Sequence, residues 1–258
     1  MENLKRSLLI VDQPSTIPPA HISAGCILTT FLISCALYLR LEFRAFKALG
    51  PGGTPQTLWG FIKVTALSFV RVSHPYEIRH AEGRPTFQQA HLRRLPTRHG
   101  PRPVTRGIAP HRQVTQKGTD ESYAMLVAAI DRLEDSSEDL RVATSCFEKH
   151  STGLFVNDPV KETCAGEACH THPSDGGSMH LTLHPSDVKV VLDAGWGERH
   201  PLAHGGWFER FVPEGFVLIY APRDVAELRT VMEIVGAAIN HVSEASLDKE
   251  EGELESGI

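Results

Sequence analysis

The sequence predicts an α+β protein: a mainly antiparallel sheet with a long C-terminal helix packed on it, preceded by an N-terminal membrane-anchor helix. Residues 22–39 carry no charged side chain, as expected for the anchor. Short segments with strand-like patterns follow one another between 140 and 220, and turn residues rather than crossover helices separate several of them. Residues 224–242 place apolar side chains at helical spacing, which predicts the C-terminal helix.

The uncharged run at 22–39 is nearly long enough, as a helix rising about 1.5 Å per residue, to cross a hydrocarbon core of about 30 Å. A core helix and a cleaved signal peptide are the alternatives, but Asp12 and the long segment before the run do not suit a signal peptide. We expect a single membrane anchor, with membrane lipid as a partner. Basic residues directly after the run place the C-terminal part on the cytoplasmic side of the endoplasmic reticulum or another internal membrane.

Five segments follow from these patterns. We expect an N-terminal polar segment (1–21), a transmembrane anchor (22–39), a juxtamembrane amphipathic region (40–74), a catalytic domain (75–243) and a disordered acidic tail (244–258). Within the juxtamembrane region, residues 57–72 predict a helix that lies on the membrane surface or packs on the domain.

Residues 73–118 are basic and rich in Pro, Gly and His, without a sustained period. Tyr76 and Phe87 are their only aromatic residues, so the stretch lacks a stacking platform and we expect no nucleic-acid partner. A solvated arm draped over the domain is the expected form of this stretch, with anionic lipid headgroups as the alternative partner.

The catalytic domain begins with a helix that Thr119 caps and whose apolar face runs from Tyr123 to Leu133. Residues 140–147 and 154–156 predict strands, and the continuous apolar run 216–220 predicts a buried one. The five cysteines have an irregular spacing that argues against a disulfide framework, so we expect free thiols. A bridge between Cys164 and Cys169 is the alternative in an oxidising compartment.

Histidines cluster where two short alternating segments flank an Asp-Gly-Gly turn, which is typical of a β-hairpin. Strand periodicity puts His170 and His172 on one face of the first strand, and His180 and His184 on one face of the second. If the two faces coincide, four imidazoles converge.

The segment Gly195–Ala203 follows a short helix that we expect Ser186 to cap and Gly195 to end. It reads as a tight turn in which Trp196, Glu198, Arg199 and His200 come close together. A connection between two elements seldom needs this combination of side chains, so the turn is a candidate wall of a site.

Two kinds of chemistry suit these residues. His170, His172 and His180 can share a metal ion, with Asp175 or Glu167 adding an oxygen ligand. Alternatively, a neutral imidazole removes a proton from an enol or phenol, while Arg199 holds the anion and Trp196 keeps water out. No Ser/His/Asp elbow, phosphate loop or dinucleotide fingerprint is present.

At this point the chain resembles the fungal luciferases and their wider luciferase-like domain family, over most of residues 20–243. The matching segments are His170-x-His172, Gly177-Ser178-Met179-His180-Leu181, Gly195-Trp196-Gly197-Glu198-Arg199-His200-Pro201-Leu202-Ala203, Leu218-Ile219-Tyr220-Ala221-Pro222-Arg223, Asn157-Asp158-Pro159 and Leu95-Pro96-x-Arg98-x-Gly100-x-Arg102-Pro103.

The resemblance implies a membrane-associated, light-emitting oxygenase. Its polyphenolic substrate, 3-hydroxyhispidin, is an α-pyrone to which O2 adds, and the resulting endoperoxide loses CO2 and leaves excited caffeylpyruvate. The family uses neither flavin nor ATP, so we expect no cofactor beyond O2, with a histidine-bound metal as the alternative. The expected catalytic residues are His170, His172, His180, Arg199 and His200. The expected substrate-binding residues are Trp196, Asp175, His184, Glu198, Tyr220 and Arg223.

Two other functions stay open from the sequence. One is a non-luminescent homologue, which would be a histidine-ligated metal enzyme of the same fold. The other is a membrane-tethered module that binds a small molecule without turning it over.

Overall fold

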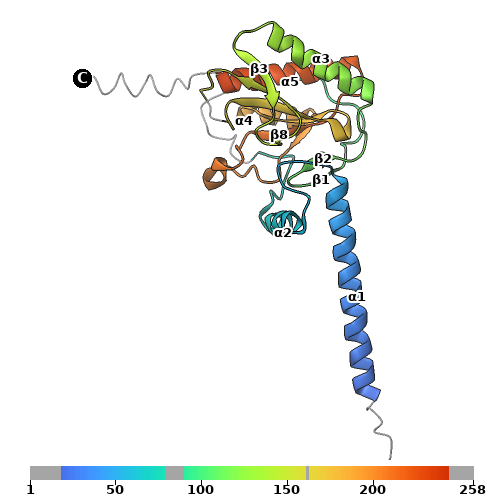
Figure 1. Ribbon diagram of the computed structural model, residues 1–258. Coiled ribbons are helices and arrows are strands. Elements are labelled where there is room, and N and C mark those ends of the chain that lie inside the picture. Colours follow the sequence, from blue (N-terminus) through green and yellow to red (C-terminus); the bar gives the residue numbers. More distant parts are fainter. Residues whose placement is uncertain (1–18, 79–89, 161–162, 244–258) are drawn as a thin grey trace, which may run out of the picture. The chain divides into compact units, whose positions relative to one another are not determined.

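The computed structural model describes residues 19–78, 90–160 and 163–243 (Figure 1). The chain divides into two units, one ending at Ala45 and one starting at Phe46, and each is described by itself. The predicted acidic tail and most of the predicted polar N-terminal segment lie outside the described residues.

The first unit consists of most of helix α1 (Pro19–Ala48), which contains the predicted apolar run and continues past it. Its part Ala24–Ala48 has a mean hydropathy of 1.7 and is, by length and composition, able to cross a membrane. Large apolar side chains such as Ile27 and Phe31 are exposed along it. The chain therefore has an N-terminal apolar helix that suits an anchor or a signal sequence.

The second unit is built on a six-stranded, fully antiparallel sheet with the strand order β3-β4-β5-β6-β8-β7. The strands are β3 (Leu140–Thr144), β4 (Thr152–Val156), β5 (Glu167–His172), β6 (Ser178–Thr182), β7 (Gly197–Arg199) and β8 (Phe216–Ile219). The predicted α+β class with a mainly antiparallel sheet is confirmed.

One face of the sheet is apolar and is covered by α5 (Val225–Ser243), the predicted C-terminal helix (Figure 1). Asp224 caps this helix because its carboxylate accepts the backbone N–H of Glu227 at 2.8 Å. The helix side chains that pack on the sheet recur at helical spacing and are fully buried: Val231, Ile234, Val235, Ala238 and Val242. Burial of this apolar stripe holds the helix on the sheet.

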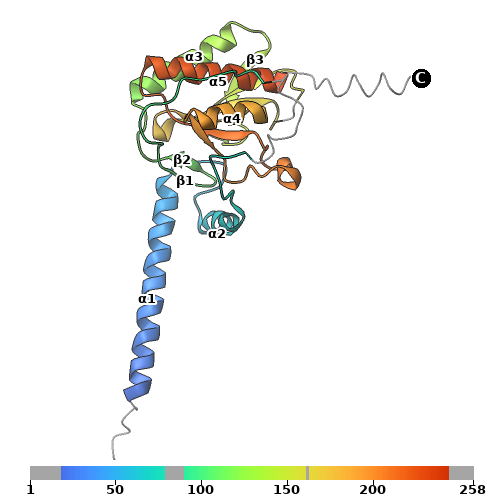
Figure 2. The ribbon, with the colours of Figure 1, turned by 180° about the vertical axis from the view of Figure 1, so that it is seen from behind.

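Helix α3 (Asp120–Asp135) lies beside α5, as both ribbon views show (Figures 1 and 2). Thr119 is its N-cap, as predicted, and forms a reciprocal capping box with Ser122. Its Leu126 and Ile130 join the same core cluster as the α5 stripe. The helix side of the sheet therefore contains the main hydrophobic core.

The opposite face of the sheet is covered by the short hairpin of β1 (Thr105–Gly107) and β2 (His111–Gln113), on the far side from α5 (Figure 2). The described part of residues 73–118 therefore lies over the domain, as expected, but it is not solvated throughout, because side chains such as Arg98 and Arg112 are buried. Arg98 and Arg112 are buried because carboxylates reach them: Arg98 pairs with Glu227 and Arg112 with Glu148.

Helix α2 (Leu58–Leu67) begins at the N-cap Thr57 and passes into a 3-10 turn, Ser68–Val70, which matches the helix predicted from residues 57–72. After it, the backbone N–H of Val72 donates to the carbonyl of Pro201 at 2.7 Å. This bond ties the chain after α2 to the segment that follows β7.

The prediction of free thiols is wrong for two of the five cysteines, because Cys146 and Cys164 form a disulfide. Cys26, Cys35 and Cys169 are free. Glu167, at the start of β5, accepts the backbone N–H of Cys146 and so draws the loop after β3 toward the segment before β5. Spacing alone does not reveal this fold-back.

Candidate active site

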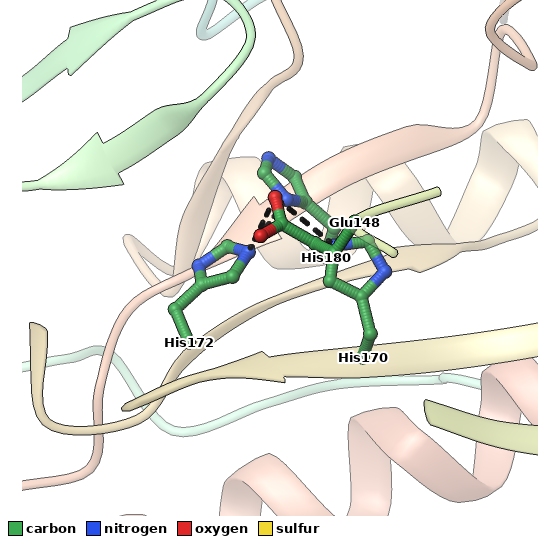
Figure 3. A group of neighbouring side chains, drawn as sticks. All are labelled: Glu148, His170, His172 and His180. Atoms are coloured by element: carbon green, nitrogen blue, oxygen red, sulfur yellow. Dashed lines mark hydrogen bonds and ion pairs between the residues drawn. The ribbon is translucent and has the colours of Figure 1, made fainter. Parts of the chain in front are cut away.

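The β5–β6 hairpin brings three of the predicted histidines together on the face opposite α5. His170 pairs directly with His180 across the two strands, and His172 pairs with Ser178. Directly paired residues and alternate residues of one strand point to the same face. Figure 3 shows the three imidazoles converging with Glu148, which lies in the segment between β3 and β4. All four side chains are buried.

His170 has one ring nitrogen held and one left facing the cluster. Its Nδ1 lies 2.5 Å from Oε1 of Glu167, whose carboxylate also accepts bonds from Ser145 and the backbone of Cys146. Its Nε2 is buried without a hydrogen-bond partner among the described residues and lies 3.9 Å from Oε1 of Glu148. A buried nitrogen without a partner is unusual and marks a position that calls for a ligand, ion or water.

His172 is oriented in the same way. Its Nδ1 lies 2.9 Å from Oγ of Ser178, which in turn donates to Oδ2 of Asp175 at 2.6 Å. Its Nε2 lies 3.0 Å from Nδ1 of His180 and 3.9 Å from Oε1 of Glu148. Asp175, a predicted substrate-binding residue, therefore lies behind the cluster and fixes the ring of His172 through Ser178.

His180 connects the cluster to the β1–β2 hairpin. Its Nε2 lies 3.2 Å from Nδ1 of His111, and Nε2 of His111 lies 3.1 Å from Oε1 of Glu198. Glu198 also accepts hydrogen bonds from the hydroxyls of Thr105 and Tyr220. A continuous chain of polar contacts thus runs from the centre of the sheet to its edge strand β7.

His200 lies beside this chain, but its two ring nitrogens have other partners. Nε2 donates to the carbonyl of Ile108 at 3.0 Å, and Nδ1 accepts the backbone N–H of Leu202 at 3.2 Å. Both contacts fix backbone segments, so His200 has no ring nitrogen left over for a proton transfer or a metal.

Burial controls the charge state of these groups. It lowers the pKa of His172, His180 and His200 well below the ordinary histidine value, and neighbouring cationic groups such as Arg112 lower the pKa of His172 further. Burial also raises the pKa of Asp175. Burial opposes ionisation of Glu198 too, but its hydrogen bonds with His111, Thr105 and Tyr220 outweigh this and lower its pKa.

A cavity of about 440 Å³ opens at the Glu198 end of the chain. Four arginines of the described residues line it: Arg71, Arg102, Arg106 and Arg199. Glu198 is the one carboxylate among its described lining residues. The guanidinium of Arg199 is anchored by the carbonyls of Glu77 and Ala203, and that of Arg102 stacks over Tyr76, 4.5 Å from the ring centroid. The cavity therefore suits an anionic aromatic molecule.

A second cavity, of about 120 Å³, adjoins the histidines. Its lining combines polar side chains, among them His170, His180 and Glu148, with apolar ones such as Phe147 and Phe216. The ring of Phe216 stacks on His180 with the centroids 5.0 Å apart. His111 lines both cavities and so forms part of the wall between them.

The remaining predicted residues lie in different places. Trp196 is buried in the main core cluster, where its indole N–H donates to the carbonyl of Pro96. His184 caps helix α4 (Pro185–Asp193) by accepting the backbone N–H of Ser186, which corrects the prediction that Ser186 is the cap. Arg223 pairs with Glu227 at the start of α5. Trp196, His184 and Arg223 do not line either cavity.

Two of the expectations for this region change in the structure. The segment Gly195–Ala203, predicted as a turn, contains the edge strand β7, because residues 197–199 pair with β8. The fourth imidazole of the cluster is that of His111 and not that of His184, because β6 ends at Thr182 and leaves His184 outside the paired strands.

The site also contains His111 and Glu148, which the sequence does not predict as site residues. His111 lies in the basic stretch that was expected to be solvated, and Glu148 lies in a loop without a recognisable motif. The signal that favours His111 is its place in a short alternating segment after a Gly-x-x-Pro turn, and no comparable signal marks Glu148.

Two groups of side chains have their potential ligand atoms within 4.8 Å of one another. One is Glu148, His170, His172 and His180, and the other is His111, His180 and His200. Imidazole and carboxylate ligands of this kind bind divalent transition metals. The contacts of His200 with backbone make the second group the poorer ligand set.

Comparisons with known proteins identify the family of this chain. A family model described as a luciferase domain matches residues 165–238. This range contains β5, β6, β7 and β8 and most of α5. A luciferase of Armillaria ostoyae is 30% identical over 229 residues, which cover 80% of this chain and 82% of that protein. The chain belongs to the fungal luciferase family.

Other luciferases of the family match at similar levels. A luciferase of Neonothopanus nambi is 30% identical over 227 residues, which cover 80% of this chain and 81% of that protein. A luciferase of Armillaria gallica is 29% identical over 244 residues, which cover 86% and 88%. No solved structure matches this chain.

Proposed function

We propose that the protein is a luciferase-type oxygenase that oxidises 3-hydroxyhispidin or a closely related hydroxylated α-pyrone with O2 and emits light. The family supports the class of reaction. The observation that carries the proposal is the position of His111, which is hydrogen-bonded to Glu198 and lines both cavities.

The larger cavity is the proposed substrate site. Its volume of about 440 Å³ lies within the range of about 300–1,000 Å³ that is usual for small-molecule pockets. A hydroxypyrone becomes an enolate when its 3-hydroxyl loses a proton, and the arginines of the cavity stabilise that anion. Tyr76, held under Arg102, offers an aromatic ring to a catechol group.

His111 and Glu198 together are the proposed base for the 3-hydroxyl proton. Both ring nitrogens of His111 are hydrogen-bonded, Nε2 with Glu198 and Nδ1 with His180, and Glu198 also lines the cavity, so this connected pair takes up the proton and not a free nitrogen of His111. Proton removal from the 3-hydroxyl yields the electron-rich enolate to which O2 adds. The endoperoxide then loses CO2, so that substrate plus O2 equals caffeylpyruvate plus CO2 in every atom. His200 and Trp196 support the loops around the site in this proposal, and are not bases.

The experiment mixes the purified full-length protein with 3-hydroxyhispidin in air and records light, O2 uptake and caffeylpyruvate. Light that depends on both O2 and the pyrone supports the proposal. O2 uptake and product without light identify a non-luminescent homologue. If folded protein takes up no O2 and forms no product, the proposal is contradicted.

A variant tests the proposed base. His111→Gln should lower turnover by about 10²–10⁴-fold, which is the usual contribution of a general base. The control is His150→Gln, because His150 is an exposed histidine between β3 and β4 and should leave turnover unchanged. If the His111→Gln variant keeps its turnover, His111 is not needed for proton removal and another residue must be the base.

A second pair of variants tests the anion site. Arg106 is an exposed arginine of the larger cavity, and Arg141 is an exposed arginine of β3 that does not line it. Arg106→Gln should raise the KM for 3-hydroxyhispidin several-fold, whereas Arg141→Gln should not. Equal KM values in the two variants would exclude Arg106 from substrate binding.

The membrane part of the proposal concerns α1. We propose that it anchors a catalytic domain at residues 75–243, with residues 40–74 next to the bilayer, in the endoplasmic reticulum or another internal membrane. The hydropathy of Ala24–Ala48 supports an anchor. The Cys146–Cys164 disulfide favours the lumenal side for the domain, against the cytoplasmic side that the flanking basic residues favour. Glycosylation-site insertion or protease protection in microsomes decides the orientation.

A further inference from the structure

We propose that Glu148, His170, His172 and His180 form a binding site for one divalent first-row transition metal ion, held by Nε2 of His170, Nε2 of His172, Nδ1 of His180 and a carboxylate oxygen of Glu148. The site goes beyond the reaction proposed above and is tested independently of it.

Ring nitrogens of the three histidines and the carboxylate of Glu148 face one another. Nε2 of His170 is buried without a hydrogen-bond partner in the described part of the chain and faces Glu148. Nε2 of His172 and Nδ1 of His180 lie 3.0 Å apart. Ligand atoms at about 2.1 Å from a metal, at right angles to each other, are separated by a similar distance. The potential ligand atoms of all four residues lie within 4.8 Å of one another.

The other ring nitrogen of each of the three histidines leads to a carboxylate, either directly or through one further side chain. Nδ1 of His170 contacts Glu167 directly. Nδ1 of His172 contacts Asp175 through Ser178, at 2.9 and 2.6 Å. Nε2 of His180 contacts Glu198 through His111, at 3.2 and 3.1 Å. Metal-binding histidines are typically held by such carboxylates, which fix the tautomer and aim the other nitrogen at the metal.

The carboxylates around the histidines differ in whether they have a cationic partner. Glu148 is paired with Arg112, which fixes the direction of its carboxylate. By contrast, neither Glu167 nor Glu198 forms a salt bridge with a Lys or Arg among the residues that the structure describes. Two buried carboxylates beside the histidine cluster therefore lack a cationic partner among the described side chains, and a bound dication supplies one.

The ligand types narrow the choice of metal. Three imidazoles and one carboxylate suit Zn, Fe, Ni, Cu or Mn, whereas Ca²⁺ and Mg²⁺ favour sites built from oxygen ligands. Cys169 adjoins His170 in sequence but belongs to the core on the opposite face of the sheet, so the set contains no thiolate. Three of the four ligands line the 120 Å³ cavity, which leaves room for a further small ligand, as in catalytic metal sites.

The experiment begins with the full-length protein, purified in detergent through a tag that binds no metal and without chelators. Elemental analysis should find about one divalent transition metal ion per chain. Chelator-treated protein should then bind Co²⁺ with a stoichiometry of one, give ligand-field absorption in the visible range, and unfold at a higher temperature than the metal-free protein. Protein that is metal-free as purified and does not bind Co²⁺ overturns the proposal.

Variants identify the ligands. Glu148→Gln and His170→Gln should each weaken Co²⁺ binding by more than tenfold, whereas the control His200→Gln should bind Co²⁺ like the wild type, because His200 contacts backbone groups instead. Binding lost in His200→Gln but kept in Glu148→Gln would contradict this ligand set. If ligand variants do not fold, Glu167→Gln keeps all four ligands and alters the outer contact of His170, along with the bonds from Ser145 and Cys146, and should weaken binding by about 10–100-fold.

The outcomes separate this site from the proposed function. Stoichiometric metal without light or O2 uptake contradicts the function and supports the site. Light from protein that neither contains a metal nor binds Co²⁺ supports the function and overturns the site.

Discussion

The two faces of the central sheet are built on different principles. The face under α5 is apolar and is made of regularly spaced residues that lie close together in sequence within each element. The opposite face carries buried histidines and acids from separate segments: His111 contacts His180 across 69 positions, and Glu198 across 87. The first face accounts for the stability of the domain, and the second carries the chemistry that we propose.

Adjacent residues of β6 make this comparison sharp. His180 points to the polar face, where it contacts His111 and His172. Leu181, the next residue, is fully buried in the core under α5. Substitutions at these two positions should therefore affect different properties of the protein.

The largest effect is expected on activity at the polar face. His180→Gln should lower turnover of 3-hydroxyhispidin by about 10²–10⁴-fold, because it interrupts the contacts that orient His111. Its free energy of unfolding should stay within about 1–2 kcal/mol of the wild type, as is common for single substitutions. Turnover and urea unfolding of the same preparation check both numbers, and unchanged turnover would end the distinction between the faces.

The next effect is expected on stability at the apolar face. Leu181→Ala should lower the free energy of unfolding by about 2–5 kcal/mol, because it leaves a cavity in the packed core. Below the denaturation temperature the folded protein should retain most of its turnover. A loss of turnover without a loss of stability would show that the two faces are not separable in this way.

These two faces also differ in how well the sequence predicts them. The capped helices α3 and α5 and the strands β5, β6 and β8 follow from local periodicity and capping residues. Periodicity also puts His170, His172 and His180 together, because a hairpin with a short loop fixes their register. Local patterns predict no other residue of the histidine cluster.

The polar face depends on contacts that no local pattern encodes. His111 reaches the cluster because the β1–β2 hairpin folds over the sheet, and Glu148 reaches it because Arg112 holds its carboxylate. The loop that carries Cys146 folds back through Glu167, and the spacing of the cysteines does not predict its disulfide. The sequence alone therefore does not predict which polar and charged residues are buried by partners that are distant in sequence.

A smaller effect is expected at the N-cap of α3, on the helix side. Thr119 accepts the backbone N–H of Ser122 at 3.1 Å and so satisfies one otherwise free donor of the helix. Thr119→Ala should lower the free energy of unfolding by about 1 kcal/mol and leave turnover unchanged. Thermal or urea unfolding measures the loss, and no loss would show that the capping box is dispensable.

The smallest effect is expected at Cys169, which should remain unreactive. Burial raises the pKa of this thiol to about 12, so the reactive thiolate is scarce at neutral pH, and the side chain is also inaccessible. A maleimide should label Cys169 only as fast as the protein unfolds. Rapid labelling of folded protein, read by mass spectrometry of its peptides, would show that the core beside the histidines opens easily.

The central claim is that this chain adds O2 to a hydroxylated pyrone and releases CO2. The most direct measurement is the gas balance of the full-length protein with 3-hydroxyhispidin, recorded together with light and the mass of the product. The account predicts one CO2 released for each O2 consumed, and a product mass equal to substrate plus O2 minus CO2. Folded protein that consumes no O2, or that consumes O2 without releasing CO2, would contradict it.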